Sequence, residues 1–211
     1  MTPATETIVV VDYGIGNLGA IPNMLRRLNA SAEVTSDPEV IRRASKLILP
    51  GVGAFDAGMR RLRELKLDMV LHERAAAEGV IILGLCLGME LMFDGSAEGV
   101  EPGLGWLHGK VVRLTGGGTS PPLPVPHMGW NLVRMRRPHP IVADLGPEPR
   151  FYFAHSYHAR CDDPEDILGT TEYGEGFPSL VSRKNIIGAQ FHPEKSHRFG
   201  LQLFRNFVAL R

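Results

Sequence analysis

Residues 80–89 read VIILGLCLGM, a nearly unbroken apolar run that ends with a cysteine between two glycines. Residues 80–85 predict a buried strand, and residues 89–93 predict a helix that follows it. A strand that is apolar throughout, rather than at every second position, is typical of a parallel sheet covered on both faces. This stretch therefore predicts an α/β fold.

The chain before this stretch indicates the same fold class. Strands alternate with helices up to residue 95, which is the pattern of a parallel sheet with helical connections. Strands are predicted at 7–11, 32–36, 46–49 and 80–85, and helices at 17–29, 38–44 and 59–77. We expect Asn17 to cap the first helix, Pro22 to lie in its first turn, and the third helix to break near Leu67.

Beyond Gly95, glycine and proline become frequent. Antiparallel additions to the same sheet are expected at 110–114, 131–135, 151–154 and 186–191, with a closing helix at 200–210. Residues 115–125, which contain a Gly-Gly-Gly run and a Pro-Pro pair, are expected to form a loop. No repeat or linker divides residues 1–211. They are predicted to form a single domain with a mostly parallel central sheet, helices on both faces and antiparallel additions in the C-terminal half.

The composition argues against several classes of protein. Basic and acidic residues number 23 each, and this zero net charge argues against nucleic acid or an anionic membrane as the partner. The longest apolar run is about ten residues, too short to span a membrane. No basic residue precedes Arg26 and there are two cysteines, so neither a targeting segment nor a disulfide framework is indicated. The expected location is the cytoplasm.

Cys86 is the first candidate for chemistry. Gly84 and Gly88 flank it two positions away on either side, which is the spacing of the strand–turn–helix elbow that presents a nucleophile. The start of a helix lowers the pKa of a thiol and offers N–H groups to an oxyanion. A packed structural cysteine is the alternative interpretation, and Cys161 belongs to no motif.

A base for this thiol is expected in QFHPE, residues 190–194. A cysteine nucleophile needs a base for its proton, and the base needs an acceptor on its second ring nitrogen. His192 and Glu194 are two residues apart, so on a regular strand their side chains would share a face. The alternative is a surface turn with a solvated histidine and glutamate.

A third segment, PGVG at residues 50–53, ends the strand predicted at 46–49. Ligands bind at the carboxyl edge of open α/β sheets, and glycines leave N–H groups free to approach an anionic oxygen. Such segments are also common as plain turns, so PGVG indicates a binding site for an anionic oxygen only together with the other two motifs.

The three segments together resemble the class I, triad-type glutamine amidotransferases, as the oxyanion strand, the nucleophile elbow and the base with its orienting acid. The likeness then narrows to the glutaminase subunits of imidazole glycerol phosphate synthase and spans about residues 7–210. The segments that carry it are DYGIGNL at 12–18, GVGAF at 51–55, PHMGWN at 126–131, FAHSY at 153–157 and KS at 195–196.

This resemblance implies a role for each residue of the triad. Cys86 would attack the side-chain amide of glutamine, His192 would act as base and then as acid, and Glu194 would orient the imidazole. The resulting thioester would be hydrolysed to glutamate. No metal or cofactor is implied, and the eight histidines show no metal-ligand spacing such as HExxH.

The resemblance also implies how the substrate is held. The oxyanion would bind the N–H of Leu87 and a peptide of the segment formed by Gly51 and Val52. Substrate contacts are expected from Gly53, Glu90, Ser156 and Tyr157. The family usually has Gln where this chain has Glu90. We expect this carboxylate to face the substrate and pair with its α-ammonium group, the alternative being that it points elsewhere on the helix.

A protein partner is implied as well. The family couples the glutaminase through an ammonia channel to a (β/α)8-barrel cyclase, which makes imidazole glycerol phosphate and an aminoimidazole carboxamide ribotide in histidine biosynthesis. A neutral chain suits a heterodimer formed through one specific patch. The candidate interface residues are Asn17, Met128, Trp130, Asn131 and Lys195. The alternative for Trp130 is burial in the core of this chain.

Three other functions stay open at this point. They are a triad glutaminase that serves a different synthase, a non-catalytic binding protein, and a cysteine peptidase or γ-glutamyl hydrolase on the same fold. The segment PHMGWN disfavours the last of these. Glutamine turnover and the identity of the synthase that copurifies would separate the others.

Overall fold

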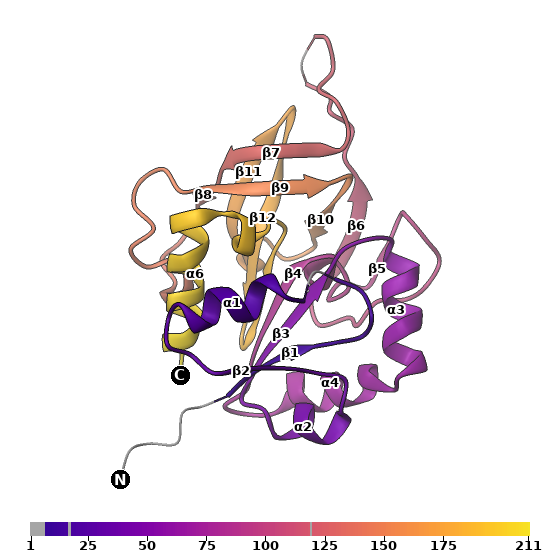
Figure 1. Cartoon of the computed structure of the whole chain (residues 1–211). Coiled ribbons are helices and arrows are strands. Elements are labelled where there is room, and N and C mark those ends of the chain that lie inside the picture. The colour runs from indigo at the N-terminus through magenta and orange to yellow at the C-terminus, as the bar shows by residue number, and fades with distance from the viewer. Residues whose placement is uncertain (1–6, 17, 119) are drawn as a thin grey trace.

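An eight-stranded sheet forms the centre of the computed structural model, which describes residues 7–16, 18–118 and 120–211 (Figure 1). Five adjacent strands run parallel in the order β2 (Ala32–Thr35), β1 (Ile8–Val11), β3 (Lys46–Gly51), β4 (Ile81–Cys86) and β13 (Ile186–Ala189). The sheet continues with the antiparallel strands β12 (Glu175–Arg183), β11 (Ile167–Tyr173) and β8 (Arg134–Met135). The predicted fold class is confirmed.

Helices cover both faces of this sheet because side chains alternate along its strands. On β1, Val9 and Val11 belong to one apolar cluster with residues of α2 (Pro38–Arg43), α3 (Phe55–Glu64) and α4 (Leu67–Ala76). Ile8 and Val10 belong to a second cluster with residues of α1 (Ala20–Arg26) and α6 (His197–Ala209). All four β1 side chains are buried, as expected for a parallel strand with helices on both sides.

Helix boundaries follow local backbone conformation. The break predicted near Leu67 is confirmed, because Lys66 adopts a left-handed conformation with φ of 56° between α3 and α4. Pro22 lies in the first turn of α1 as predicted, but that helix begins at Ala20 with Gly19 as its N-cap. Asn17, the predicted cap, lies outside the described residues. No helix in the described part of the chain has the length and hydropathy needed to cross a bilayer.

Several strands predicted in the C-terminal half lie outside the main sheet. β7 (His127–Leu132) pairs with β9 (Arg150–His155) in a sheet of two strands. β6 (Gly109–Arg113) lies between β10 (Tyr157–Cys161) and β5 (Gly95–Ser96) in a sheet of three. The strand predicted at 131–135 is therefore wrong as a single element, since its parts belong to β7 and β8. Burial alternates along β9, which is typical of a sheet with one packed and one exposed face.

The loop predicted at 115–125 forms no helix or strand in its described part, residues 115–118 and 120–125. Two contacts anchor it. The hydroxyl of Thr115 donates to Glu175 over 2.9 Å, and the hydroxyl of Tyr173 donates to the carbonyl of Pro124 over 2.8 Å. In Figure 1 the loop rises from the end of the molecule where β7 lies.

Candidate active site

Cys86 stands on the predicted elbow, as the last residue of β4 and the N-cap of α5 (Leu87–Glu90). Its φ of 51° and ψ of −113° are a strained combination for a residue with a side chain. The flanking glycines allow a close approach of the backbone. A Cβ on Gly88 would overlap the carbonyl oxygen of Leu49 on β3, and one on Gly84 would lie 2.7 Å from the carbonyl oxygen of Gly88. The elbow thus holds the thiol at the carboxyl edge of the sheet.

The thiol is not activated in advance. Burial raises the pKa of Cys86 well above its ordinary value, and the charge of Glu90 raises it further. The hydrogen bond from the N–H of Leu87, at the start of α5, lowers this pKa but does not compensate for burial. The predicted lowering by the helix start is present but is outweighed by burial, so the thiol stays protonated until a base removes its proton.

His192 and Glu194 form a buried pair that can supply this base. The imidazole Nδ1 lies 2.8 Å from Glu194 Oε1, and the two side chains are 4% and 6% exposed. A carboxylate only accepts hydrogen bonds, so Nδ1 carries the proton and Nε2 is left as an acceptor. This burial excludes the alternative of a solvated surface turn.

Strand pairing brings this pair to the edge of the sheet that carries Cys86. β13 runs parallel to β4, with Ala189 opposite Leu85, so the chain leaves β13 beside the elbow. The strand at 186–191 was predicted to be an antiparallel addition, which is wrong, because β13 is parallel to β4 and ends at Ala189. The histidine and glutamate meet across a 3-10 turn at Pro193–Lys195. The prediction that they share a strand face is therefore wrong, because the strand ends before His192 and the two residues flank Pro193 at the start of this turn.

Ser196 supports this turn, although no motif singled it out as functional. Its hydroxyl donates to the carbonyl of His192 over 2.6 Å and accepts from the N–H of Tyr152 over 3.0 Å. Ser196 is fully buried and ties the base to β9. Its one signal in the sequence is its position at the end of the KS segment.

The PGVG segment lies against the elbow. Gly51, the last residue of β3, pairs in register with Cys86. The hydroxyl of Tyr13 donates to the carbonyl of Pro50 over 2.7 Å and holds this strand end. Val52 is 43% exposed and borders the cavity beside the thiol. Both predicted sources of oxyanion N–H groups therefore lie close to the nucleophile.

A cavity of about 320 Å³ opens beside the thiol. The predicted residues that line it are Val52, Gly53, Cys86, Leu87, Glu90, Ser156, Tyr157 and, from the predicted interface, Met128. Glu98 also lines it and belongs to no predicted motif, whereas Pro126, Ala154 and His155 come from the segments PHMGWN and FAHSY without a role predicted for them. Gly51, His192 and Glu194 are not among the lining residues.

Glu90 faces this cavity from α5, which excludes the alternative that it points elsewhere on the helix. Its Oε1 accepts from Gln190 Nε2 over 2.7 Å. Burial raises the pKa of Glu90 to about 8, the hydrogen bond from Gln190 acts against this rise, and the charge of Glu98 adds to it. No lysine or arginine is among the described residues that line the cavity, so it suits a cationic group.

Two of the predicted interface residues share the exposed face of β7. Met128 is 63% exposed and Trp130 is 45% exposed, which excludes burial of the tryptophan in the core. The Trp130 ring stacks on His197, with ring centroids 5.3 Å apart. Lys195 is exposed near the same face, with its Nζ 5.7 Å from the ring centre of Tyr152, the residue opposite Trp130 on β9.

The other two predicted interface residues are not on this face. Asn131 is half-buried, and its side-chain amide donates to the carbonyl of Glu172 over 2.9 Å. It follows Trp130 on β7, and neighbouring residues of a strand point to opposite faces. Asn17 lies outside the described residues.

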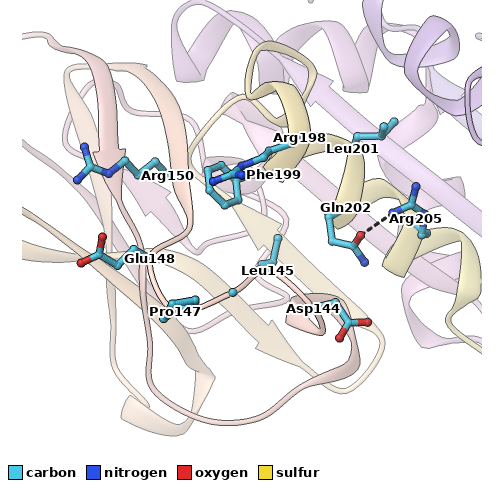
Figure 2. A pocket seen from close by; sticks show the side chains of 11 residues that line it. Asp144, Leu145, Pro147, Glu148, Arg150, Arg198, Phe199, Leu201, Gln202 and Arg205 are labelled. Atoms are coloured by element: carbon cyan, nitrogen blue, oxygen red, sulfur yellow. Dashed lines mark hydrogen bonds between the residues drawn. The ribbon is translucent and has the colours of Figure 1, made fainter.

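A larger hollow of about 930 Å³ lies beside α6 (Figure 2). Its lining includes Arg150, Arg198 and Arg205 together with Asp144 and Glu148. None of the predicted site residues lines it, and no cysteine or histidine is among its described lining residues. The chemistry predicted from the sequence therefore belongs to the smaller cavity at Cys86.

This fold, with a cysteine elbow and a buried His–Glu pair at one sheet edge, is that of a glutamine amidotransferase. The model of the family described as "Glutamine amidotransferase class-I" matches residues 9–210. The chain is 49% identical to imidazole glycerol phosphate synthase subunit HisH 2 of Pseudomonas aeruginosa, over 96% of this chain and 99% of that protein. It is 47% identical to the protein of the same name from Methanococcus maripaludis, over 95% and 98%. The chain belongs to the HisH family, the glutaminase subunits of imidazole glycerol phosphate synthase.

Solved structures agree on the fold. A crystal structure of a glutamine amidotransferase superimposes with a TM-score of 0.74 at 19% identity, covering 96% of this chain and all of the other. A glutamine amidotransferase from Thermotoga maritima gives a TM-score of 0.67 at 15% identity, covering 97% of each chain. At such identities the likeness concerns the fold alone.

Proposed function

We propose that this chain hydrolyses glutamine through a thioester on Cys86 and passes the ammonia to a (β/α)8-barrel cyclase. The observation that carries this proposal is the thiol of Cys86 in a cavity at the sheet edge that also bears the buried His192–Glu194 pair. Membership of the HisH family supports glutamine hydrolysis in histidine biosynthesis. The proposed location is the cytoplasm, where thiols stay reduced.

The first half of the reaction forms the thioester. Nε2 of His192 takes the thiol proton, and the sulfur of Cys86 attacks the amide carbon of the glutamine side chain. The N–H of Leu87 and one N–H of the segment 51–52 hold the oxyanion. When the tetrahedral intermediate collapses, His192 gives its proton to the nitrogen and ammonia leaves.

The second half regenerates the thiol. His192 takes a proton from water, whose oxygen attacks the thioester carbon, and glutamate is released. The proton returns to the sulfur of Cys86. Glu194 holds the imidazolium in both halves by accepting from Nδ1. Since burial keeps the resting thiol protonated, the base is required in every turnover.

Glutamine binds with its side-chain amide next to the thiol of Cys86 and with its α-ammonium group next to Glu90. Gly53, Ser156 and Tyr157 also line the cavity and are the other proposed contacts of the substrate, and Glu90 pairs with the α-ammonium group. The cavity is lined by Glu90 and Glu98 and by no lysine or arginine among the described residues, and this supports the orientation because carboxylates attract the cationic end of the substrate.

Glu90→Gln is expected to stabilise the fold and to weaken glutamine binding. The folded carboxyl has a pKa of about 8, whereas the unfolded carboxyl ionises near 4.5. At pH 7 folding must therefore protonate this group, which costs on the order of 3 kcal/mol. The contribution of Glu90 to the free energy of unfolding is fully present below pH 4.5 and decreases as the pH rises toward 8. The glutamine side chain of the variant does not ionise, so this decrease is absent from Glu90→Gln.

Thermal unfolding and glutamine kinetics of the complex between pH 6 and 9 check this prediction. We expect the KM of Glu90→Gln to rise about tenfold near pH 8, where the wild-type carboxyl becomes charged, and less at pH 6. Glu78→Gln removes the same charge at an exposed position and should change neither quantity. An unchanged KM at pH 8 would contradict the pairing of Glu90 with the substrate.

The proposed cyclase binds the face that carries Met128, Trp130 and Lys195. Two large apolar side chains exposed side by side on one strand are typical of the centre of an interface. Met128 also lines the cavity at Cys86, so a partner seated on this face reaches the mouth of the glutaminase site. Ammonia released at the thiol then has a short path into the partner.

The experiment that tests this function mixes the chain with the cyclase of its own organism. We expect the two to copurify, and glutamine to support formation of imidazole glycerol phosphate from the cyclase's phosphoribulosyl substrate. Free ammonium salts should replace glutamine when the chain is left out. Glutamate release coupled to a different synthase, with no binding to the cyclase, would favour the alternative of a triad glutaminase with another acceptor.

A further inference from the structure

A chain of hydrogen bonds runs behind the wall of the glutamine cavity. His155 ends β9, lines the cavity and is 5% exposed. Its Nδ1 lies 2.7 Å from the carbonyl oxygen of Tyr157, which begins β10. The histidine therefore bridges the turn between the two strands. This turn, residues 155–157, carries Ser156 and forms one side of the cavity.

His127 on β7 continues this chain away from the cavity. Its Nδ1 lies 3.0 Å from His155 Nε2, and its Nε2 lies 3.3 Å from the side-chain nitrogen of Asn131. The His127 ring is stacked on Phe153 and Tyr173, with centroid distances of 4.7 and 4.0 Å. These rings hold the imidazole at a fixed angle between its two partners.

The partners determine which nitrogen of each histidine carries a proton. The carbonyl of Tyr157 only accepts, so Nδ1 of His155 donates and its Nε2 accepts. Nδ1 of His127 must then donate, which leaves its Nε2 to accept from the amide of Asn131. Every bond is satisfied when both rings are neutral. Burial lowers the pKa of His155 to about 3 and that of His127 to about 4, which keeps them neutral.

We propose that His127 and His155 are positioning residues of the glutaminase site. They hold the carbonyl of Tyr157, and hence the turn at 155–157, in the conformation that accepts glutamine. This inference rests on the proposed function in taking glutamine as the ligand of the cavity. Neither histidine reacts with the substrate, and the triad histidine is a separate residue, His192.

The network has the features expected of a positioning element. Its two histidines are buried, and each of their ring nitrogens has a hydrogen-bond partner. A fully connected polar network of this kind restrains the segments that it joins. It links β7, β9 and β10, which belong to two different small sheets. The strand pairing of β9 joins the turn at 155–157 to β7 through the backbone, and the network adds a link through side chains.

Two variants of His155 separate its two bonds. Asparagine places an amide nitrogen near the position of Nδ1, so His155→Asn keeps a donor for the Tyr157 carbonyl and loses the bond to His127. Glutamine places its amide group near Nε2, so His155→Gln keeps a partner for His127 and loses the bond to Tyr157. Each variant gives up one buried hydrogen bond and should be similarly destabilised in thermal unfolding.

Glutamine kinetics of the complex then distinguish positioning from packing. We expect His155→Gln to raise the KM about tenfold and His155→Asn to raise it less than about threefold, with kcat changed little in both. Equal KM values in the two variants would overturn the proposal, because the bond to Tyr157, which His155→Asn keeps and His155→Gln loses, would then have no effect on glutamine binding. No rise in KM for His155→Gln would overturn it as well.

Nitrogen-15 NMR of the histidine rings tests the network without turnover. In the wild-type chain, His127 and His155 should be neutral and protonated on Nδ1 between pH 6 and 8, the less common form of free histidine. Titration of either ring near pH 6.5, or protonation on Nε2, would overturn the network. A wild-type chain that shows this network but hydrolyses no glutamine with its cyclase would refute the proposed function alone.

Discussion

Replacement of Cys86 by alanine is expected to lower glutamine turnover by about 10⁴-fold or more if the site works through the proposed thioester. The thioester forms on this sulfur, and the cavity holds no other nucleophilic thiol among its described lining residues. Alanine keeps the backbone and Cβ of the elbow, so the fold and the binding of glutamine should persist. The measurement is glutamate release by the complex under saturating glutamine.

Cys161→Ala is the matched control for this loss. Cys161 is half-buried on β10, does not line the cavity, and has a pKa raised to about 12, chiefly by burial. Its replacement should leave glutamine turnover within about twofold of the wild-type rate, because the side chain is not part of the proposed site. If Cys86→Ala kept more than a few per cent of wild-type turnover, the thioester route would be wrong. If Cys161→Ala lost activity instead, the assignment of the nucleophile would be wrong.

Replacement of Gly88 by alanine is expected to destabilise the fold by about 3 kcal/mol, a large part of the stability of an ordinary domain. The added Cβ would overlap the carbonyl oxygen of Leu49, a backbone atom of β3 that cannot move aside like the end of a side chain. Relief requires β3 to shift relative to β4, which pairs with it from Lys46 to Gly51. Urea unfolding measures the loss.

Gly19→Ala serves as the control for Gly88→Ala. A Cβ on Gly19 would have no atom within 4 Å, and its φ of −76° suits any residue. Its unfolding midpoint should stay close to that of the wild type. Insoluble expression of Gly88→Ala together with soluble expression of Gly19→Ala would agree with the prediction. An unchanged midpoint for Gly88→Ala would contradict the close packing of the elbow on β3.

The N-terminal half of the fold was predictable because three of its strands are apolar on both faces and its helices lie between the strands. β1, β3 and β4 therefore appear in the sequence as short runs of apolar residues, whereas β2 is a partly exposed edge strand. β11 and β12 were missed, since Gly169 and Pro178 interrupt their patterns. These two strands occupy the main sheet, whereas the predicted strands near residues 110 and 151 lie in smaller sheets. Local patterns do not specify which strands pair.

The candidate site divides in the same way. Cys86, His192 and Glu194 were found from short motifs, because a nucleophile elbow and a base with its acceptor require particular neighbours in the chain. Glu98 was missed because it belongs to no motif, and His155 lies in the FAHSY segment but was given no role there. The opposite orientations of Trp130 and Asn131 became clear only from the pairing of β7 with β9.

The sequence by itself determined the α/β class, the elbow at Cys86 and the pairing of His192 with Glu194, since each depends on residues that are neighbours along the chain. Only the tertiary structure decided the protonation of the groups in the site. The start of α5 lowers the pKa of the Cys86 thiol, but burial among distant segments raises it more. The neutral pair of His127 and His155 likewise exists because β7 and β9 meet. Desolvation is the sum over all surrounding atoms, and most of those atoms come from residues far away in the chain.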